Sequence, residues 1–147
     1  MATTFDRCVY CFEPHADPGP CPICGYESGL VDQPAWVLSP GTILRGRYVL
    51  GQCREQRNTE LVYLAWDLNT RRRLEIVEYF PRDLATRDCT AAPTVVCLPG
   101  QEEAIESGKQ RFFEKAKLYY QCISRVEPLE MDFFVRNETC YYLRERE

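Results

Sequence analysis

The sequence predicts an α+β protein in which a small four-cysteine unit precedes a five-stranded antiparallel sheet with one principal helix. Three observations support this prediction. Two Cys-x-x-Cys pairs lie near the N-terminus, short stretches rich in β-branched and aromatic residues recur from residue 47 onward, and residues 109–124 have helical periodicity. No apolar run approaches the roughly 20 residues of a membrane helix. Because the N-terminus also lacks the pattern of a secretion signal, we expect a cytoplasmic protein.

We expect the 147 residues to form two units, a ribbon with its linker at 1–33 and a larger domain at 34–147. Charge differs between the two ends of the chain. Residues 1–40 hold five acidic side chains and one basic side chain, so the whole net charge of −4 lies there. A module that binds nucleic acid is expected to carry an excess of Lys and Arg. The acidic ribbon therefore argues against a nucleic-acid partner.

Four cysteines have the spacing of a metal site. Cys8 and Cys11 form one Cys-x-x-Cys pair, and Cys21 and Cys24 form the other, with nine residues between the pairs. Each pair can direct two thiolates at one tetrahedral ion, and four thiolates close its coordination shell. The second pair, with Gly25 after it, resembles the knuckle of zinc ribbons and rubredoxins, which implies a structural Zn²⁺. Iron is the alternative metal, because tetrahedral sulfur sites accept either ion.

The other thiols and the single histidine have plainer interpretations. Nine cysteines is an odd number, which in a chain without a secretion signal argues against a disulfide framework or a redox dithiol. His15 lies between the two pairs, and we interpret it as a solvated loop residue rather than a further ligand. We interpret the remaining five cysteines as free thiols that are buried or partly buried: Cys53, Cys89, Cys97, Cys122 and Cys140.

The larger domain is predicted element by element from its patterns. Three strands are expected at 47–53, 61–67 and 73–79, the last ending before Pro81, which has no amide hydrogen for a ladder. A short extra strand is expected at 94–98 within an otherwise unreadable stretch. The helix at 109–124 places Phe112 and Ala116 on one apolar stripe. Two final strands at 131–135 and 139–143 form a hairpin around the turn at 136–138.

This order of elements and three motifs resemble the N-lobe of bacterial serine/threonine protein kinases, of the kind preceded by a zinc ribbon. The Pro-Gly-Thr-x-Leu-x-Gly-Arg-Tyr stretch of that group is matched at residues 40–48, and its Tyr-Leu-Ala-x-Asp strand at residues 63–67. Its Ala-Ile-Lys-Glu-Tyr-Phe-Pro segment is matched at Ile76 and at residues 78–81. Arg87 and Asn137 fit the later pattern, and the resemblance covers essentially the whole chain.

The departures from the kinase pattern fall at the positions that handle phosphate. The three glycines of the phosphate-covering loop fall on Glu55, Arg57 and Glu60, the nucleotide-binding lysine falls on Val77, and the helix glutamate that orients this lysine falls on Lys115. Kinases work by positioning phosphate and stabilising its charge, so these substitutions remove the means of catalysis. The sequence also ends about where a kinase enters its C-lobe, which carries the catalytic aspartate and the magnesium ligand.

We therefore expect no enzyme activity, no ATP binding and no membrane association. The resemblance implies a pseudokinase-like scaffold or regulatory module that binds a protein partner. One alternative is a nucleotide sensor that binds ATP without turnover. Another is a nucleic-acid reader that uses the arginines at 45, 47, 54, 57 and 71–73, although Glu55, Glu60 and Asp67 are expected to balance them. A C-lobe supplied by another chain is also compatible with the sequence.

Overall fold

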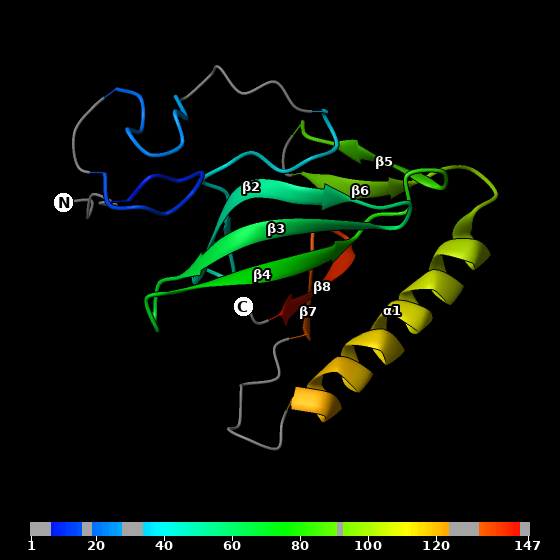
Figure 1. Cartoon of the computed structure of the whole chain (residues 1–147). Coiled ribbons are helices and arrows are strands. Elements are labelled where there is room, and N and C mark those ends of the chain that lie inside the picture. The colour runs from blue at the N-terminus through cyan, green and yellow to red at the C-terminus, as the bar shows by residue number, and fades with distance from the viewer. Residues whose placement is uncertain (1–6, 16–18, 28–33, 91–92, 124–132, 145–147) are drawn as a thin grey trace.

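The computed structural model describes residues 7–15, 19–27, 34–90, 93–123 and 133–144, without the side chains of 120–123 (Figure 1). The sheet strands near the N-terminus are β1 (Ile43–Leu44), β2 (Tyr48–Gln56), β3 (Glu60–Asp67) and β4 (Arg72–Tyr79). A hairpin, the helix and two further strands follow: β5 (Ala85–Asp88), β6 (Thr94–Cys97), α1 (Glu102–Ile123), β7 (Phe133–Arg136) and β8 (Thr139–Arg144).

The main sheet has six antiparallel strands in the order β1-β2-β3-β4-β8-β7, so the prediction of five strands is wrong by one. The additional strand is β1, in which Ile43 pairs with Val49 and Leu44 with Tyr48. Arg45 and Gly46 have positive φ angles of 55° and 63°, which fold this short segment back onto β2. Two residues carry too little periodicity for a strand to be recognised from the sequence.

A separate two-stranded sheet, β5-β6, lies beside the main one (Figure 1). The strand expected at 94–98 is observed as β6, whereas its partner β5 was not predicted. The amide of Val95 donates to the carbonyl of Asn137 in the β7–β8 turn at 2.8 Å. This bond ties the small sheet to the large one.

Helix α1 begins at Glu102, earlier than the predicted start at residue 109. Gly108 lies inside the helix and against β4. A Cβ atom at Gly108 would lie 1.9 Å from the hydroxyl oxygen of Tyr79, which donates to the carbonyl of Ile105 at 3.2 Å. The glycine is therefore needed for close packing of strand and helix. No helix in the described residues is long and apolar enough to cross a membrane.

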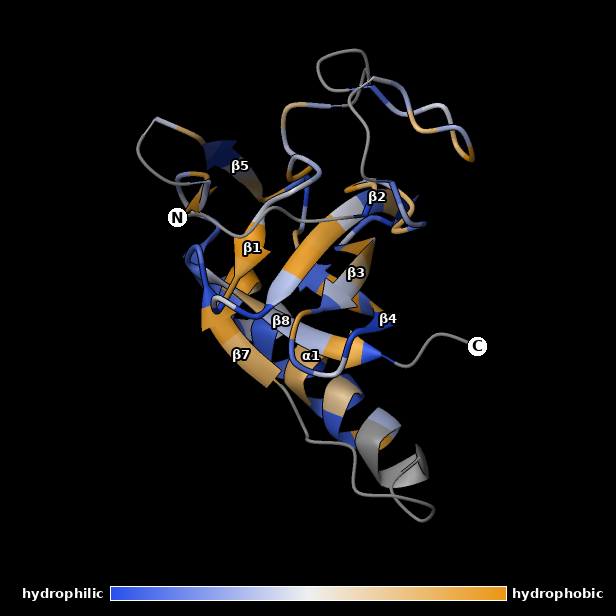
Figure 2. Cartoon of the chain, turned by 90° about the vertical axis from the view of Figure 1, so that its left-hand side faces the viewer, coloured by the Kyte–Doolittle hydropathy of each residue, from blue (hydrophilic) through white to orange (hydrophobic). Residues whose placement is uncertain are grey.

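The sheet has two differently covered faces. The helix-side face packs against Phe112 and Ala116 of α1, as the apolar stripe predicted. The linker-side face packs against Val37 and Leu38, which precede the sheet. Because both faces are covered, every residue of β3 is buried, and Figure 2 shows hydrophobic residues along β1, β2 and β7. The residues on the helix-side face include Val62, Val77, Tyr79 and Tyr142, and those on the linker-side face include Tyr63, Ile76, Phe80 and Tyr141.

Candidate functional site

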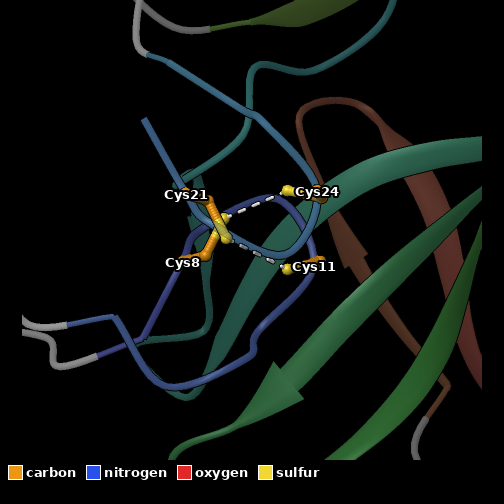
Figure 3. A group of neighbouring side chains, drawn as sticks. All are labelled: Cys8, Cys11, Cys21 and Cys24. Carbon is orange, nitrogen blue, oxygen red and sulfur yellow. Dashed lines mark hydrogen bonds between the residues drawn. The ribbon is translucent and has the colours of Figure 1, made fainter. Parts of the chain in front are cut away.

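The structure brings together the four cysteines that the sequence predicted as metal ligands (Figure 3). The Sγ atoms of Cys8 and Cys24 are 3.6 Å apart, and those of Cys11 and Cys21 are 3.8 Å apart. All four sulfurs lie within 4.8 Å of one another. A zinc ion with four thiolates at about 2.3 Å requires sulfurs about 3.8 Å apart. The observed arrangement fits a tetrahedral ion.

Backbone amides favour the thiolate form of Cys21 in the second pair, whereas desolvation raises the pKa of Cys24. The backbone N–H of Cys24 is the largest cause that lowers the pKa of Cys21 to about 6, and the N–H of Ile23 lowers it further against the effect of desolvation. The Ile23 nitrogen lies 3.4 Å from this sulfur. Desolvation raises the pKa of Cys11 to about 12. Cys21 can therefore meet an incoming ion as a thiolate, whereas Cys11 ionises on binding it.

His15 is not part of this group. Its Nε2 atom lies 3.1 Å from the carbonyl oxygen of Gly19, at the surface of the loop. Within the described residues, the four cysteines are the one cluster of His, Cys, Asp and Glu with the geometry of a metal site. Among the other thiols, Cys140 is buried and Cys53 is half-buried, whereas Cys89 is exposed, contrary to the prediction. The side chain of Cys122 lies outside the described residues.

The positions that depart from the kinase pattern also lie close together. A guanidinium nitrogen of Arg57 lies 2.9 Å from Glu55 and another lies 3.2 Å from Glu60. The ammonium of Lys115, which reaches over from α1, lies 2.9 Å from both carboxylate oxygens of Glu60. Val77 is fully buried on the same face of the sheet. Three strands and the helix thus contribute to one small region.

Two further ion pairs, which the sequence analysis missed, continue this region along the sheet. Arg144 at the end of β8 donates to Glu75 at 2.7 Å, and Arg54 lies 3.7 Å from the other oxygen of that carboxylate. Arg144 also lies 4.0 Å from Glu55. Glu75 stands two residues before Val77, at the alanine of the kinase Ala-Ile-Lys motif, so strand alternation could have indicated it.

We call these seven side chains the charged cluster. They are Arg54, Glu55, Arg57, Glu60, Glu75, Lys115 and Arg144. Four are cationic and three anionic, and each cation lies within 4.0 Å of a carboxylate. A phosphate group approaching this surface would have to compete with carboxylates for every one of these cations. The cluster is thus arranged to neutralise itself rather than to present free positive charge.

Comparisons with known proteins show the fold but no family. No family model matches the chain, and no curated protein matches it. Among solved structures, the apo form of PpkA-294, a fragment of a bacterial serine/threonine kinase, is similar with a TM-score of 0.63 and 21% identity. The match covers 75% of this chain and 38% of that chain. The chain therefore shares a fold with part of a kinase fragment and spans less than half of its length.

Proposed function

We propose that this chain is a non-catalytic, kinase N-lobe-like module that binds a protein partner and carries a structural zinc ribbon. The single observation that carries the proposal is the charged cluster. The resemblance places loop glycines at Arg57 and Glu60 and the lysine-orienting glutamate at Lys115. In this chain Glu60 forms ion pairs with both Arg57 and Lys115. A cytoplasmic location belongs to the same proposal.

The pair of Glu60 and Lys115 is the strongest support for the absence of catalysis. In a kinase the strand lysine must be free to contact nucleotide phosphates while the helix glutamate orients it. Here the helix carries the cation Lys115, which lies 2.9 Å from both carboxylate oxygens of Glu60 at the start of β3, a glycine position in the kinase pattern. The buried Val77 offers no charge. This pairing supports a module in which Lys115 links the helix to the sheet and does not orient a nucleotide-binding lysine.

The metal part of the proposal rests on the sulfur geometry. Cys8, Cys11, Cys21 and Cys24 would hold Zn²⁺ as four thiolates, which leaves no coordination position for water or substrate. Such a closed site supplies folding energy to the loops that carry the ligands. We therefore assign the ion a structural role.

Two assays on the purified chain test the absence of nucleotide chemistry. In calorimetric titration with ATP and magnesium we expect no saturable heat, and with radiolabelled ATP we expect no phosphate transfer to the chain or to generic protein substrates. Saturable binding without transfer would favour the nucleotide-sensor alternative. Phosphate transfer would overturn the proposal.

A third experiment tests the partner. The tagged wild-type chain, an Arg57→Ala/Lys115→Ala variant and a Lys117→Ala control are used for affinity capture from the native host. Lys117 pairs with Glu114 on the surface of α1, outside the charged cluster. We expect a stoichiometric protein partner with the wild type and the control. Recovery of nucleic acid instead, or of the chain alone, would contradict the proposed role.

A further inference from the structure

The two cysteine loops share the same backbone arrangement but differ in the residue that follows the second cysteine. In each loop the amide of the residue after the second cysteine donates at 2.8 Å to the carbonyl of the first: Phe12 to Cys8, and Gly25 to Cys21. Both residues have positive φ angles, 66° for Phe12 and 80° for Gly25. This conformation suits glycine and costs a bulky residue about 1 kcal/mol or more. A phenylalanine at this position therefore needs a compensating contact.

The contact is with the main sheet. Phe12 is fully buried, in a cluster with Val49 of β2 and with Leu64 and Trp66 of β3. Its ring centroid lies 6.0 Å from that of Trp66. The guanidinium of Arg7 covers Trp66 at 4.2 Å from the ring centroid. The first cysteine loop is thus anchored on the sheet by a buried aromatic side chain, at the end opposite α1 (Figure 1).

Strand β2 is shaped to receive this loop. A Cβ atom at Gly51 would lie 2.8 Å from the ring of Phe12 and 2.8 Å from the carbonyl oxygen of Tyr10. That carbonyl accepts a hydrogen bond from the amide of Gln52 at 3.2 Å. The glycine therefore permits a close approach that a larger residue would prevent.

Strand β4 contacts the first cysteine loop at Cys11, one of the four expected metal ligands. Arg73 donates from Nε to the carbonyl oxygen of Cys11 at 3.2 Å, and its terminal nitrogen forms an ion pair with Glu13. Cys11 and Glu13 flank Phe12 on either side. The three strands β2, β3 and β4 together fix the position of one of the four sulfurs.

We propose that this sheet surface is a structural part of the metal centre, so that ion binding and sheet stability are coupled through Phe12 and Arg73. The proposal rests on the zinc binding proposed above. Coupling of this kind is reciprocal: if the docked sheet raises zinc affinity, bound zinc stabilises the sheet by the same free energy. Residues that orient metal ligands commonly change affinity by about 10–100-fold when they are removed.

The substitution Phe12→Gly separates this proposal from an independent ribbon by the sign of its effect. It places at position 12 the residue that the second loop already uses at position 25. In an independent ribbon, relief of the strained conformation should leave zinc affinity unchanged or raise it. In the docked arrangement the anchor is lost, and we expect zinc affinity to fall by about 10–100-fold.

The measurement is zinc competition against a chromophoric chelator, using the full chain. Arg73→Ala provides a second variant that leaves the cysteine loop itself unaltered, and we expect it to weaken zinc binding in the same direction. Leu118→Ala is the control, because Leu118 is 62% exposed on α1, outside the cysteine loops, and its truncation should leave the affinity unchanged. In a Trp36→Phe background, the fluorescence of Trp66 should change on zinc removal.

The outcomes distinguish the two proposals. A wild-type chain that binds no zinc would overturn the metal site and the coupling together. Zinc binding with the same affinity in the wild type, Phe12→Gly and Arg73→Ala would overturn the coupling alone. If Phe12→Gly does not fold even with zinc, Arg73→Ala decides: weaker zinc binding than the wild type supports the coupling, and unchanged affinity overturns it.

Discussion

Positions 77 and 78 are neighbours on strand β4, and their side chains point to opposite faces of the sheet. The residue at 78 matches the kinase pattern, whereas the residue at 77 does not. Glu78 matches the pattern and is fully buried on the linker-side face, where it forms an ion pair with Arg87 at 2.7 Å. Val77, where the resemblance places a lysine, is fully buried on the helix-side face. At these two positions the linker-side face buries a charged side chain, Glu78, and the helix-side face buries an apolar one, Val77.

The surroundings explain the contrast. Glu78 accepts hydrogen bonds from the hydroxyls of Tyr63, at 2.9 Å, and Tyr141, so that its charge is fully satisfied by the chain itself. Val77 lies opposite Val62 and Tyr142 in the ladder. A lysine at this position would need a nearby carboxylate as its partner, and the helix position where the resemblance places a glutamate holds Lys115 instead. Under the proposed function, the chain keeps the kinase pattern where side chains serve the fold and departs from it where they would serve a ligand.

The largest expected effect comes from breaking the buried pair with Arg87→Ala. Arg87 also donates to the carbonyl oxygens of Trp36, at 2.8 Å, and Pro93, at 3.1 Å, so it joins the linker and the β5–β6 hairpin to the sheet. Its loss leaves the carboxylate of Glu78 buried without a counter-charge. We expect the free energy of unfolding to fall by about 3–5 kcal/mol, measured by urea denaturation.

The control for this substitution is Arg136→Ala, an exposed residue whose guanidinium bonds the carbonyl of its neighbour Val135. We expect a change within about 0.5 kcal/mol. Equal effects at the two arginines would show that the Glu78 pair does not stabilise the linker-side face in the way that its burial suggests.

The second effect tests the other face by restoring the kinase lysine with Val77→Lys. The new ammonium would be buried beside Val62 and Tyr142, with Lys115 on the adjacent helix. We expect a loss of about 2–4 kcal/mol, from the pKa shifts of buried lysines. In the double variant Val77→Lys/Lys115→Glu, part of this stability should return. ATP binding by Val77→Lys, measured by calorimetry, would contradict this contrast between the faces, because it would mean that the helix-side face can still serve a ligand.

The sequence predicted the parts of this molecule that depend on local patterns. The four cysteines follow from their spacing, and β2, β3 and β4 from runs of β-branched and aromatic residues. The resemblance assigned Glu55, Glu60 and Lys115 to phosphate-handling positions, but the ion pairs in which they take part were not predicted.

Features set by contacts between distant segments were missed. The helix begins at Glu102, before the predicted start, and Gly108 inside it packs closely against Tyr79, which nothing in the helical pattern reveals. The docking of the cysteine loop depends on Phe12 meeting Trp66. A signal for it existed, since the two loops differ in having phenylalanine or glycine after the second cysteine, but its meaning depends on a surface formed by other strands.

The third effect, that of Gly108→Ala, tests how closely the helix packs on the helix-side face of the sheet. Gly→Ala inside a helix normally stabilises it by up to about 1 kcal/mol. At Gly108 we expect the opposite, a loss of about 1–3 kcal/mol, because the new methyl group would overlap the hydroxyl of Tyr79. Thermal unfolding with Ser107→Ala as the exposed neighbouring control measures the difference. Stabilisation by both substitutions would mean that the helix can move away from β4 at little cost.

The smallest effect is expected from Lys115→Ala, although this residue stands at the centre of the charged cluster. The side chain of Lys115 is 47% exposed, and Arg57 remains within reach of Glu60 after the substitution. We therefore expect a loss of at most about 1 kcal/mol, which should diminish at high salt. Lys117→Ala, which breaks a surface pair with Glu114, is the matched control on the same helix.

The value of this last comparison lies in its salt dependence. If Lys115 links the helix to the sheet through a buried carboxylate, Lys115→Ala should lower the free energy of unfolding more than Lys117→Ala at every ionic strength. The reason is that ion pairs with a buried partner are screened less by salt. Glu60, at 7% exposure, is such a partner, whereas Glu114, at 51%, is not. A residual difference between the two variants at high salt would therefore identify Lys115 as the clamp between helix and sheet. Equal behaviour would assign that role to the apolar contacts of Phe112 and Ala116 alone.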